Sequence, residues 1–365
     1  MKELNDLRKE INDIDQKMAS LFEERMEVVK AISDFKREHG LALVDSKREE
    51  EVIKRNLEFI KDESIKCYYV DFIKAVMNES KKYQASFLNG IKVAYSGVPG
   101  AFSYSAAKKA FPNANYVAYP DFESAYKACE AGEVEVVVLP IENSSAGEVG
   151  AVMDLTFQGS LKINKVFDLE ITQNLLGVKG SSKKDIKRVI SHPQALNQCR
   201  EYISKHSLET EEFSNTALAA LEVQRRNDKS IAAIGSEEVA ELYGLEVLAS
   251  HINTVSNNTT RFACYSRVER IPDKDTKMGE HFILVYTVIN QAGALAQTLN
   301  IIGSHGFNMR NVKSRPMKEL AWNYYFFVEI EGNANSQDGR DVVNELKTIC
   351  DRLKLVGTYY DFKDK

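Results

Sequence analysis

The first 88 residues contain almost no glycine or proline, and their apolar residues recur at alternating spacings of three and four. This spacing places apolar side chains on one stripe of an α-helix. Gly40 ends the first helix, and a second begins after Asp45 and Ser46. A third helix is predicted from about Ser64 to Phe87. Because three helices with one long arm close a core poorly, we expect at least a dimer at this end. The stripe of the first helix consists of Leu4, Leu7, Ile11, Ile14, Met18, Leu21, Val28, Ile32 and Phe35.

The overall composition excludes several classes of protein. Of the 365 residues 44 % are hydrophobic and 28 % charged, and no apolar run is long enough to span a membrane. From its charged, helical pattern we expect the N-terminus not to be a secretion signal, and five scattered cysteines without a CxxC pair favour a reducing cytoplasm. The net charge of −5 argues against a general nucleic-acid binder. GxGxxG, GxxxxGK[ST] and HExxH are all missing, so we expect no nucleotide cofactor and no metal.

The periodicity changes at Asn89-Gly90. From there to about residue 267, short apolar strands alternate with helices, which predicts parallel sheets covered on both faces. This length suits two lobes with a cleft between them. Residues 280–365 then follow the order strand, helix, strand, strand, helix, strand, with the second helix at 336–352. That order is the ferredoxin-like plan, and the charged segment 267–278 is predicted to be a linker.

Polar residues interrupt the apolar stripes of the helical segment. Arg25 occupies a stripe position, and Lys36 lies three turns further along the same face. Ser80 and Gln84 continue the apolar stripe of the third helix. Singly, each is explained by an interface salt bridge, but together with Arg48 and Glu49 they favour an anionic ligand. Arg8 is too far along the helix to reach the same site, unless an antiparallel partner helix delivers it.

Four sequence stretches make this segment similar to the all-helical chorismate mutases: LRKEINDID (7–15), EER (23–25), DSKREE (45–50) and ESKKYQ (79–84). The resemblance implies an intertwined dimer and a pericyclic rearrangement that needs no nucleophile, only a held conformer and stabilised charge. It also implies that Lys36 and Gln84 donate to the ether oxygen. The chorismate carboxylates would bind Arg25, Arg48 and the partner's Arg8, and the remaining contacts would come from Asp45, Glu49 and Ser80.

The central segment carries polar clusters at the ends of its strands, where α/β proteins place their sites. They are a glycine turn (96–107), PIENSS (140–145), SHPQAL (191–196) and NNTTRF (257–262). Singly, the serines are explained as helix caps, Glu142 as a structural pair and His192 as a turn-fixing group. Thr260 beside Arg261 differs, because it suits a neutral proton donor next to a carboxylate anchor.

Together the last three of these clusters resemble prephenate dehydratase over residues 91–267. The resemblance implies a two-lobed α/β fold like that of periplasmic binding proteins, and no cofactor. Thr260 would help the ring hydroxyl to leave. Independently of the resemblance, the glycine turn opens a helix whose N-terminus offers unpaired N–H groups to an anion. Some relatives carry an acid near Ser214, and this chain has none. The residues implied in substrate binding are Glu142, Asn143, Ser144, Ser191, Gln198 and Arg261.

The last segment has two short motifs, GALA (293–296) and KSRP (313–316), whose simplest explanation is turn formation. The segment is nevertheless similar to the ACT domain, an α+β ferredoxin-like regulatory module. That resemblance implies phenylalanine binding between paired domains, and inhibition of the enzyme. Lys313 stands where the second motif usually has an acid, and this difference is expected to weaken amino-acid binding or to change its selectivity. The implied effector-binding residues are Gly293, Ala294, Leu295, Ser314 and Arg315.

The sequence thus predicts a multidomain chain with an all-α mutase domain (1–88), a two-lobed dehydratase domain (91–267) and a regulatory domain (280–365). We expect a cytoplasmic homodimer or higher homo-oligomer that converts chorismate to prephenate and then to phenylpyruvate. Two alternatives stay open: only one activity is retained, or the two-lobed part is a non-catalytic small-molecule-binding module. A fused prephenate dehydrogenase is disfavoured by the missing nucleotide motif.

Overall fold

The structure is a computed structural model, which describes residues 3–39, 46–255, 257–269, 279–317 and 323–360. The chain divides into two compact units: Met1–Lys92 with Asn113–Asn115, and the remainder of the chain. Asp45 and Gly40 lie outside the described residues, as does most of the predicted linker 267–278. Among the helices that the structure describes, none has the length and apolar character needed to cross a bilayer.

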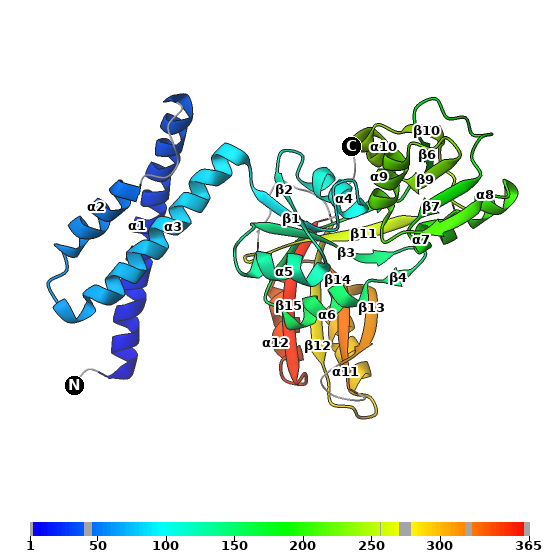
Figure 1. Cartoon of the computed structure of the whole chain (residues 1–365). Coiled ribbons are helices and arrows are strands. Elements are labelled where there is room, and N and C mark those ends of the chain that lie inside the picture. Colours follow the sequence, from blue (N-terminus) through cyan, green and yellow to red (C-terminus); the bar gives the residue numbers. More distant parts are fainter. Residues whose placement is uncertain (1–2, 40–45, 256, 270–278, 318–322, 361–365) are drawn as a thin grey trace. The chain divides into compact units, whose positions relative to one another are not determined.

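The first unit is built from helices, as its periodicity predicts (Figure 1). Val29 of the first helix is buried, as are Ile73 and Met77 of the last helix, which packs against the first. The nine stripe residues of the first helix, by contrast, stay between 42 % and 62 % exposed. One chain therefore leaves the apolar stripe of its long helix in water. The elements are α1 (Leu4–His39), α2 (Ser46–Leu57), the short 3₁₀ helix η1 (Glu63–Ile65) and α3 (Lys66–Asn89).

The first lobe of the second unit is a mixed sheet in the order β2-β1-β3-β11-β5, with β4 beside β3. β1 and β3 run parallel, whereas β11 is antiparallel to both β3 and β5. The expectation of parallel sheets is therefore wrong for this lobe, because β11 returns from the second lobe and inserts between β3 and β5. The elements are β1 (Lys92–Ser96), α4 (Phe102–Ala110), β2 (Asn115–Tyr119), α5 (Phe122–Glu130), β3 (Val136–Asn143), β4 (Gly147–Glu148), α6 (Gly150–Gln158), β5 (Lys162–Glu170) and β11 (Thr259–Ser266).

The second lobe is also a mixed sheet, in the order β10-β6-β9-β7-β8. β7 is parallel to β8 and β9, and β6 is antiparallel to its neighbours β9 and β10. The chain passes between the lobes twice, after β5 and before β11. The elements are β6 (Asn174–Gly177), β7 (Arg188–Ser191), α7 (Pro193–Gln198), α8 (Arg200–Lys205), β8 (Glu209–Glu212), α9 (Thr216–Arg226), β9 (Ile231–Gly235), α10 (Glu237–Tyr243) and β10 (Glu246–Ala249).

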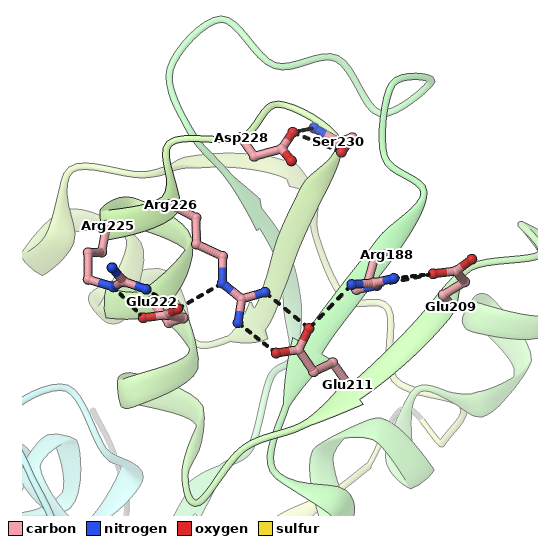
Figure 2. A network of polar contacts seen from close by, with 8 residues as sticks. All are labelled: Arg188, Glu209, Glu211, Glu222, Arg225, Arg226, Asp228 and Ser230. Carbon is pink, nitrogen blue, oxygen red and sulfur yellow. Dashed lines mark hydrogen bonds and ion pairs between the residues drawn. The ribbon is translucent and has the colours of Figure 1, made fainter.

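A network of charged residues fastens α9 to the edge of this second sheet (Figure 2). The Arg226 guanidinium contacts Glu211 of β8 and Glu222 of its own helix, each at 2.7 Å. Arg188 of β7 lies 3.6 Å from the same Glu211 and 2.7 Å from Glu209. The network binds the C-terminal end of α9, whereas the N-terminal end of the same helix lines the cleft between the two lobes. It therefore fixes a helix that forms part of the cleft wall.

Residues 280–360 follow the predicted order of strands and helices and form the antiparallel sheet β13-β14-β12-β15. The helix predicted at 336–352 ends earlier, at Leu346, because β15 already begins at Arg352, which pairs with Thr287. The elements are β12 (Glu280–Thr287), α11 (Ala294–Ser304), β13 (Asn308–Pro316), β14 (Tyr324–Glu331), α12 (Gln337–Leu346) and β15 (Arg352–Tyr360).

The two faces of this C-terminal sheet pack against different partners. Phe282 and Leu284 face the core formed with α11 and α12, whereas Ile283 and Val285 join the core of the first lobe. β15 comes so close to β5 that a Cβ on Gly357 would lie 2.1 Å from a backbone oxygen of that strand. The C-terminal domain therefore shares a hydrophobic core with the first lobe.

Candidate active sites

Three of the polar residues singled out in the helical unit meet where α1 packs on α3. Arg25 donates a hydrogen bond to the hydroxyl of Ser80, and burial lowers the pKa of the Arg25 guanidinium. Ser80 and Gln84 are 4 % and 8 % exposed, one helical turn apart on α3. Glu49 of α2 lies 3.1 Å from Lys81 of α3. A guanidinium, a hydroxyl and an amide thus line one side of this helix junction.

The remaining basic residues of this unit are distributed differently. Lys36 is half-buried on α1, one turn beyond Ser33, whose hydroxyl donates to the backbone oxygen of Gln84 at 3.4 Å. Arg48 is exposed and pairs with Glu51 at 3.1 Å, and Arg8 is exposed near the start of α1. One chain therefore brings Arg25, Ser80 and Gln84 to one helix junction, whereas Lys36 lies further along α1 and Arg8 and Arg48 are exposed.

A cleft of about 540 Å³ lies between the two lobes of the second unit. The first lobe contributes Asn143 and Thr260, and the second contributes His192, Gln198 and Asn215. None of the lining residues, within the part of the chain that the structure describes, is a lysine or an arginine. The N-terminal ends of α4 and α9 both reach the cleft, and helix N-termini carry partial positive charge.

Thr260 and Asn143 are hydrogen-bonded neighbours in adjacent strands at the floor of this cleft. They are paired residues of β11 and β3, and the Nδ2 of Asn143 donates to the Oγ1 of Thr260 at 2.9 Å. Both side chains are buried, at 9 % and 7 % exposed. Because Oγ1 already accepts a hydrogen bond, the hydroxyl proton of Thr260 is left for an acceptor in the cleft.

The neighbours of this pair, Arg261 and Glu142, point to the opposite face of the sheet, as alternation along a strand requires. Both terminal nitrogens of Arg261 donate to Glu329 of β14, at 2.7 and 2.6 Å. Burial opposes the charge of Arg261, but its bonds with Glu329 outweigh burial and raise the pKa of Arg261. Glu142 lies 2.8 Å from Lys313 of β13. The structure therefore removes both side chains from the cleft, contrary to the expectation that they bind substrate.

Two other predicted substrate ligands have structural partners. Ser191 is fully buried and its hydroxyl donates to the backbone oxygen of Ile234 at 2.7 Å, so it does not reach the cleft surface. Ser144 is exposed, and its hydroxyl accepts from the backbone N–H of Thr259 at 2.9 Å. His192 caps α7 by accepting from the N–H of Gln194 at 3.2 Å, which agrees with its interpretation as a turn-fixing group.

Two polar residues without an assigned role on sequence grounds lie beside this site. The Nδ2 of Asn143 also donates to Asn258 Oδ1 at 2.9 Å, and Gln173 Nε2 donates to Gln198 Oε1 at 3.1 Å. Asn258 belongs to the NNTTRF cluster, so its position two residues before Thr260 was a usable signal. Gln173 lies in the crossing between the lobes, where no local pattern marks it.

The two C-terminal motifs lie at the start of α11 and on strand β13. Gly293 has a left-handed backbone with φ +85° at the start of α11, which favours glycine there. On β13, Ser314 is exposed, whereas Arg315 turns to the first lobe and contacts Glu148 at 2.5 Å and Asp154 at 3.2 Å. Ser314 and Arg315 therefore face opposite sides, and Lys313 shares the side of Arg315.

Comparison with known proteins finds two family models that match separate parts of the chain. Residues 7–85 match the family model for chorismate mutase type II, and residues 93–270 match that for prephenate dehydratase. The bifunctional chorismate mutase/prephenate dehydratase of Aquifex aeolicus (strain VF5) is 31 % identical, over 98 % of each chain. That of Neisseria gonorrhoeae (strain ATCC 700825 / FA 1090) is 31 % identical, over 96 % of this chain and 95 % of the relative.

Among solved structures, the prephenate dehydratase of Arthrobacter aurescens in complex with L-Phe is similar, with a TM-score of 0.68 and 27 % identity. The match covers 74 % of this chain and 90 % of that chain. Fold and matches define a class of enzyme in which a helical mutase is joined to a two-lobed dehydratase. The chain belongs to the family of bifunctional chorismate mutase/prephenate dehydratases, enzymes of phenylalanine biosynthesis.

Proposed function

We propose that the cleft between the lobes converts prephenate to phenylpyruvate, with Thr260 as the hydrogen-bond donor to the departing ring hydroxyl. The observation that supports this most directly is the 2.9 Å bond from Asn143 Nδ2 to Thr260 Oγ1. That bond occupies an acceptor site of the threonine and leaves its proton for the substrate. A donor that meets the leaving oxygen stabilises the charge that develops there as the C–O bond breaks.

The carboxylates of prephenate are held, in this proposal, by helix N-termini and neutral side chains. The absence of lysine and arginine from the described cleft lining supports this arrangement. One carboxylate leaves as carbon dioxide and gives its electrons to the ring. A close cation would stabilise that carboxylate more before the reaction than in the transition state, and so slow the step. The N-termini of α4 and α9 attract anions more weakly, while Asn143 and Gln198 contact the polar groups of the substrate.

In the helical unit, chorismate binds at the junction of α1 and α3. The hydrogen bond from Arg25 to Ser80 and the buried amide of Gln84 support this. They place a guanidinium and an amide, both hydrogen-bond donors, at the same helix junction. Lys36 and Gln84 donate to the ether oxygen, on which charge develops as the bond to it breaks. Arg25 binds one carboxylate. The contacts still needed come from Asp45, Arg48, Glu49 and Ser80, and from Arg8 of a second chain.

The enzyme acts as a homodimer or higher homo-oligomer built through α1. The nine stripe residues of α1, 42 % to 62 % exposed, support this proposal because an apolar stripe of that length is costly in water. A second α1 packed antiparallel covers the stripe and brings its Arg8 toward Arg25. Without that partner the site lacks its third guanidinium, which in this proposal only Arg8 of a second chain supplies.

The C-terminal domain is, we propose, an ACT domain that binds phenylalanine and lowers dehydratase activity. A related dehydratase was solved in complex with L-Phe, and the strand order β13-β14-β12-β15 is the ferredoxin-like order. The effector contacts lie at Gly293–Leu295 and at Ser314. Arg315 serves coupling instead, because its guanidinium is bound to Glu148 and Asp154 of the first lobe.

One assay tests these activities together. Chorismate consumption and phenylpyruvate appearance are followed with and without phenylalanine, using the full-length chain. We expect both activities, with phenylpyruvate formation suppressed by phenylalanine. Prephenate that accumulates without phenylpyruvate would mean that only the mutase is retained. Unchanged chorismate together with turnover of added prephenate would mean the reverse.

A further inference from the structure

Asn258 stands directly behind the Asn143–Thr260 pair. Its side chain is 2 % exposed, and its Oδ1 accepts from Asn143 Nδ2 at 2.9 Å. We propose that Asn258 is a positioning residue of the dehydratase: it sets the amide of Asn143 so that this amide donates to Thr260. The inference rests on the proposed role of Thr260 and adds a residue that never touches the reacting atoms.

The orientation of the Asn143 amide follows from its other contacts. Its Oδ1 accepts from the backbone N–H groups of Ser145 and Ala146, at 3.0 and 2.9 Å. An amide turned the other way would point its NH₂ group at two N–H donors, so the assignment of oxygen and nitrogen is fixed. Nδ2 must therefore face Thr260 and Asn258.

The two hydrogens of this Nδ2 have three acceptors within reach. Thr260 Oγ1 and Asn258 Oδ1 each lie at 2.9 Å, and the backbone oxygen of Thr259 lies at 3.2 Å. When Asn258 takes one hydrogen, the other is directed at Thr260. Without the Asn258 oxygen, the amide plane of Asn143 tilts so that one Nδ2 hydrogen approaches the Thr259 carbonyl. Because both hydrogens lie in this plane, the tilt also moves the other hydrogen away from Thr260 Oγ1. The threonine hydroxyl then loses the contact that orients its own proton.

The opposite end of Asn258 distinguishes this role from ordinary packing. The Oδ1 of Asn258 faces Asn143, so its Nδ2 points the other way. This Nδ2 is buried and makes no hydrogen bond with any of the described residues. Natural folds rarely keep a buried donor unpaired when only structure is at stake. Asn258 also lines a pocket of about 220 Å³, which shares Gln198 with the main cleft. The side chain thus lies between this smaller pocket and the Asn143–Thr260 pair of the main cleft.

Two substitutions in the full-length enzyme separate positioning from packing. Asn258→Ala removes the acceptor, whereas Asn258→Asp keeps an oxygen in the Oδ1 position. We expect Asn258→Ala to lower the dehydratase kcat at least about tenfold with KM within about twofold, because a misplaced donor costs rate rather than binding. Asn258→Asp should keep kcat within about threefold of the wild type. Chorismate mutase activity of the same chains controls for folding.

A double-mutant cycle with Asn143 gives the decisive readout. If Asn258 acts through Asn143, adding Asn258→Ala to an Asn143→Ala enzyme changes kcat by less than about twofold. Multiplicative losses would overturn the inference, as would a raised KM at unchanged kcat or an Asn258→Asp enzyme as slow as Asn258→Ala. Thr260→Ala, measured in parallel, distinguishes a failure of the proposed role of Thr260 from a failure of the inference about Asn258. An active Thr260→Ala enzyme contradicts the proposed chemistry, whereas a normal Asn258→Ala enzyme beside an inactive Thr260→Ala contradicts only this inference.

Discussion

Arg261 of β11 and Glu329 of β14 form a two-point ion pair, with N–O distances of 2.7 and 2.6 Å. Arg261 directly follows Thr260, yet the two side chains serve opposite faces of the sheet. Glu142 and Asn143 repeat the arrangement on β3, with Glu142 bound to Lys313. Each strand thus presents one residue to the cleft and its neighbour to the C-terminal domain. A movement of the C-terminal sheet therefore acts on the strands that carry Thr260 and Asn143.

The first prediction concerns this coupling. Lys313→Met breaks the 2.8 Å pair with Glu142 and keeps most of the aliphatic side chain. We expect the uninhibited dehydratase kcat to stay within about twofold, because neither partner lines the cleft, while inhibition by phenylalanine weakens at least about threefold. Calorimetric titration of phenylalanine should show that the amino acid still binds. Lys347→Met, at an exposed position just after α12, is the control. If phenylalanine inhibited Lys313→Met as strongly as Lys347→Met, the coupling would be refuted.

Gln84 gives a prediction about pH. A carboxyl in place of this buried amide donates to the ether oxygen only while it is protonated. The mutase kcat/KM of Gln84→Glu should therefore fall as pH rises from about 5 to about 8, through the pKa of the new carboxyl. The wild type should change much less over the same range. A flat profile for the variant would remove Gln84 from the ether contact.

The shared mutase site can be tested by mixing two inactive variants. Arg8→Ala and Arg25→Ala should each abolish mutase activity as pure proteins. In a mixed dimer, one site has the intact Arg25 of one chain and the intact Arg8 of the other. Random exchange of subunits should then restore roughly a quarter of wild-type activity. Mixing with no recovery, after exchange is verified by mass-labelled chains, would mean that Arg8 does not cross between subunits.

The network in Figure 2 predicts a stability difference that depends on pH. Hydrogen bonds from Arg225 and Arg226 lower the pKa of Glu222 to about 2, from an ordinary value of 4.5. Because the folded pKa is the lower one, the stabilisation is complete above the unfolded pKa and disappears as pH falls toward 2. Glu222→Gln should therefore melt below the wild type at pH 7, and the gap should close on acidification. Glu241→Gln, an exposed change on α10, should show no such closing gap in melting temperature.

The sequence predicts the helical unit well because its signal is local. Spacings of three and four determine α1 and α3, and the polar breaks at Arg25, Ser80 and Gln84 mark the place where the structure brings those residues together. The order of elements after residue 280 is equally local. The last helix ends earlier than its local pattern predicts, because β15 begins at Arg352 through pairing with distant Thr287.

The misplacement of Arg261 and Glu142 has one physical origin, the alternation of side chains along a strand. From the sequence we expect the neighbours Thr260 and Arg261 to share one site, but Thr259–Ser266 is a strand. In a strand, Thr260 and Arg261 cannot both face the cleft. The alternation rule would have separated them if the strand had been recognised. The antiparallel insertion of β11 depends on long-range pairing, which no local pattern reveals.

The central claim is that Thr260 supplies the donor for the dehydratase and takes no part in the mutase. The most direct measurement follows chorismate consumption and phenylpyruvate formation by Thr260→Ala and Thr260→Ser in the full-length chain. We predict that Thr260→Ala lowers phenylpyruvate formation by about 10² to 10⁴-fold, with prephenate accumulating at the wild-type rate. Thr260→Ser, which keeps the hydroxyl, should recover a large part of the activity. Undiminished phenylpyruvate formation by Thr260→Ala would contradict the account.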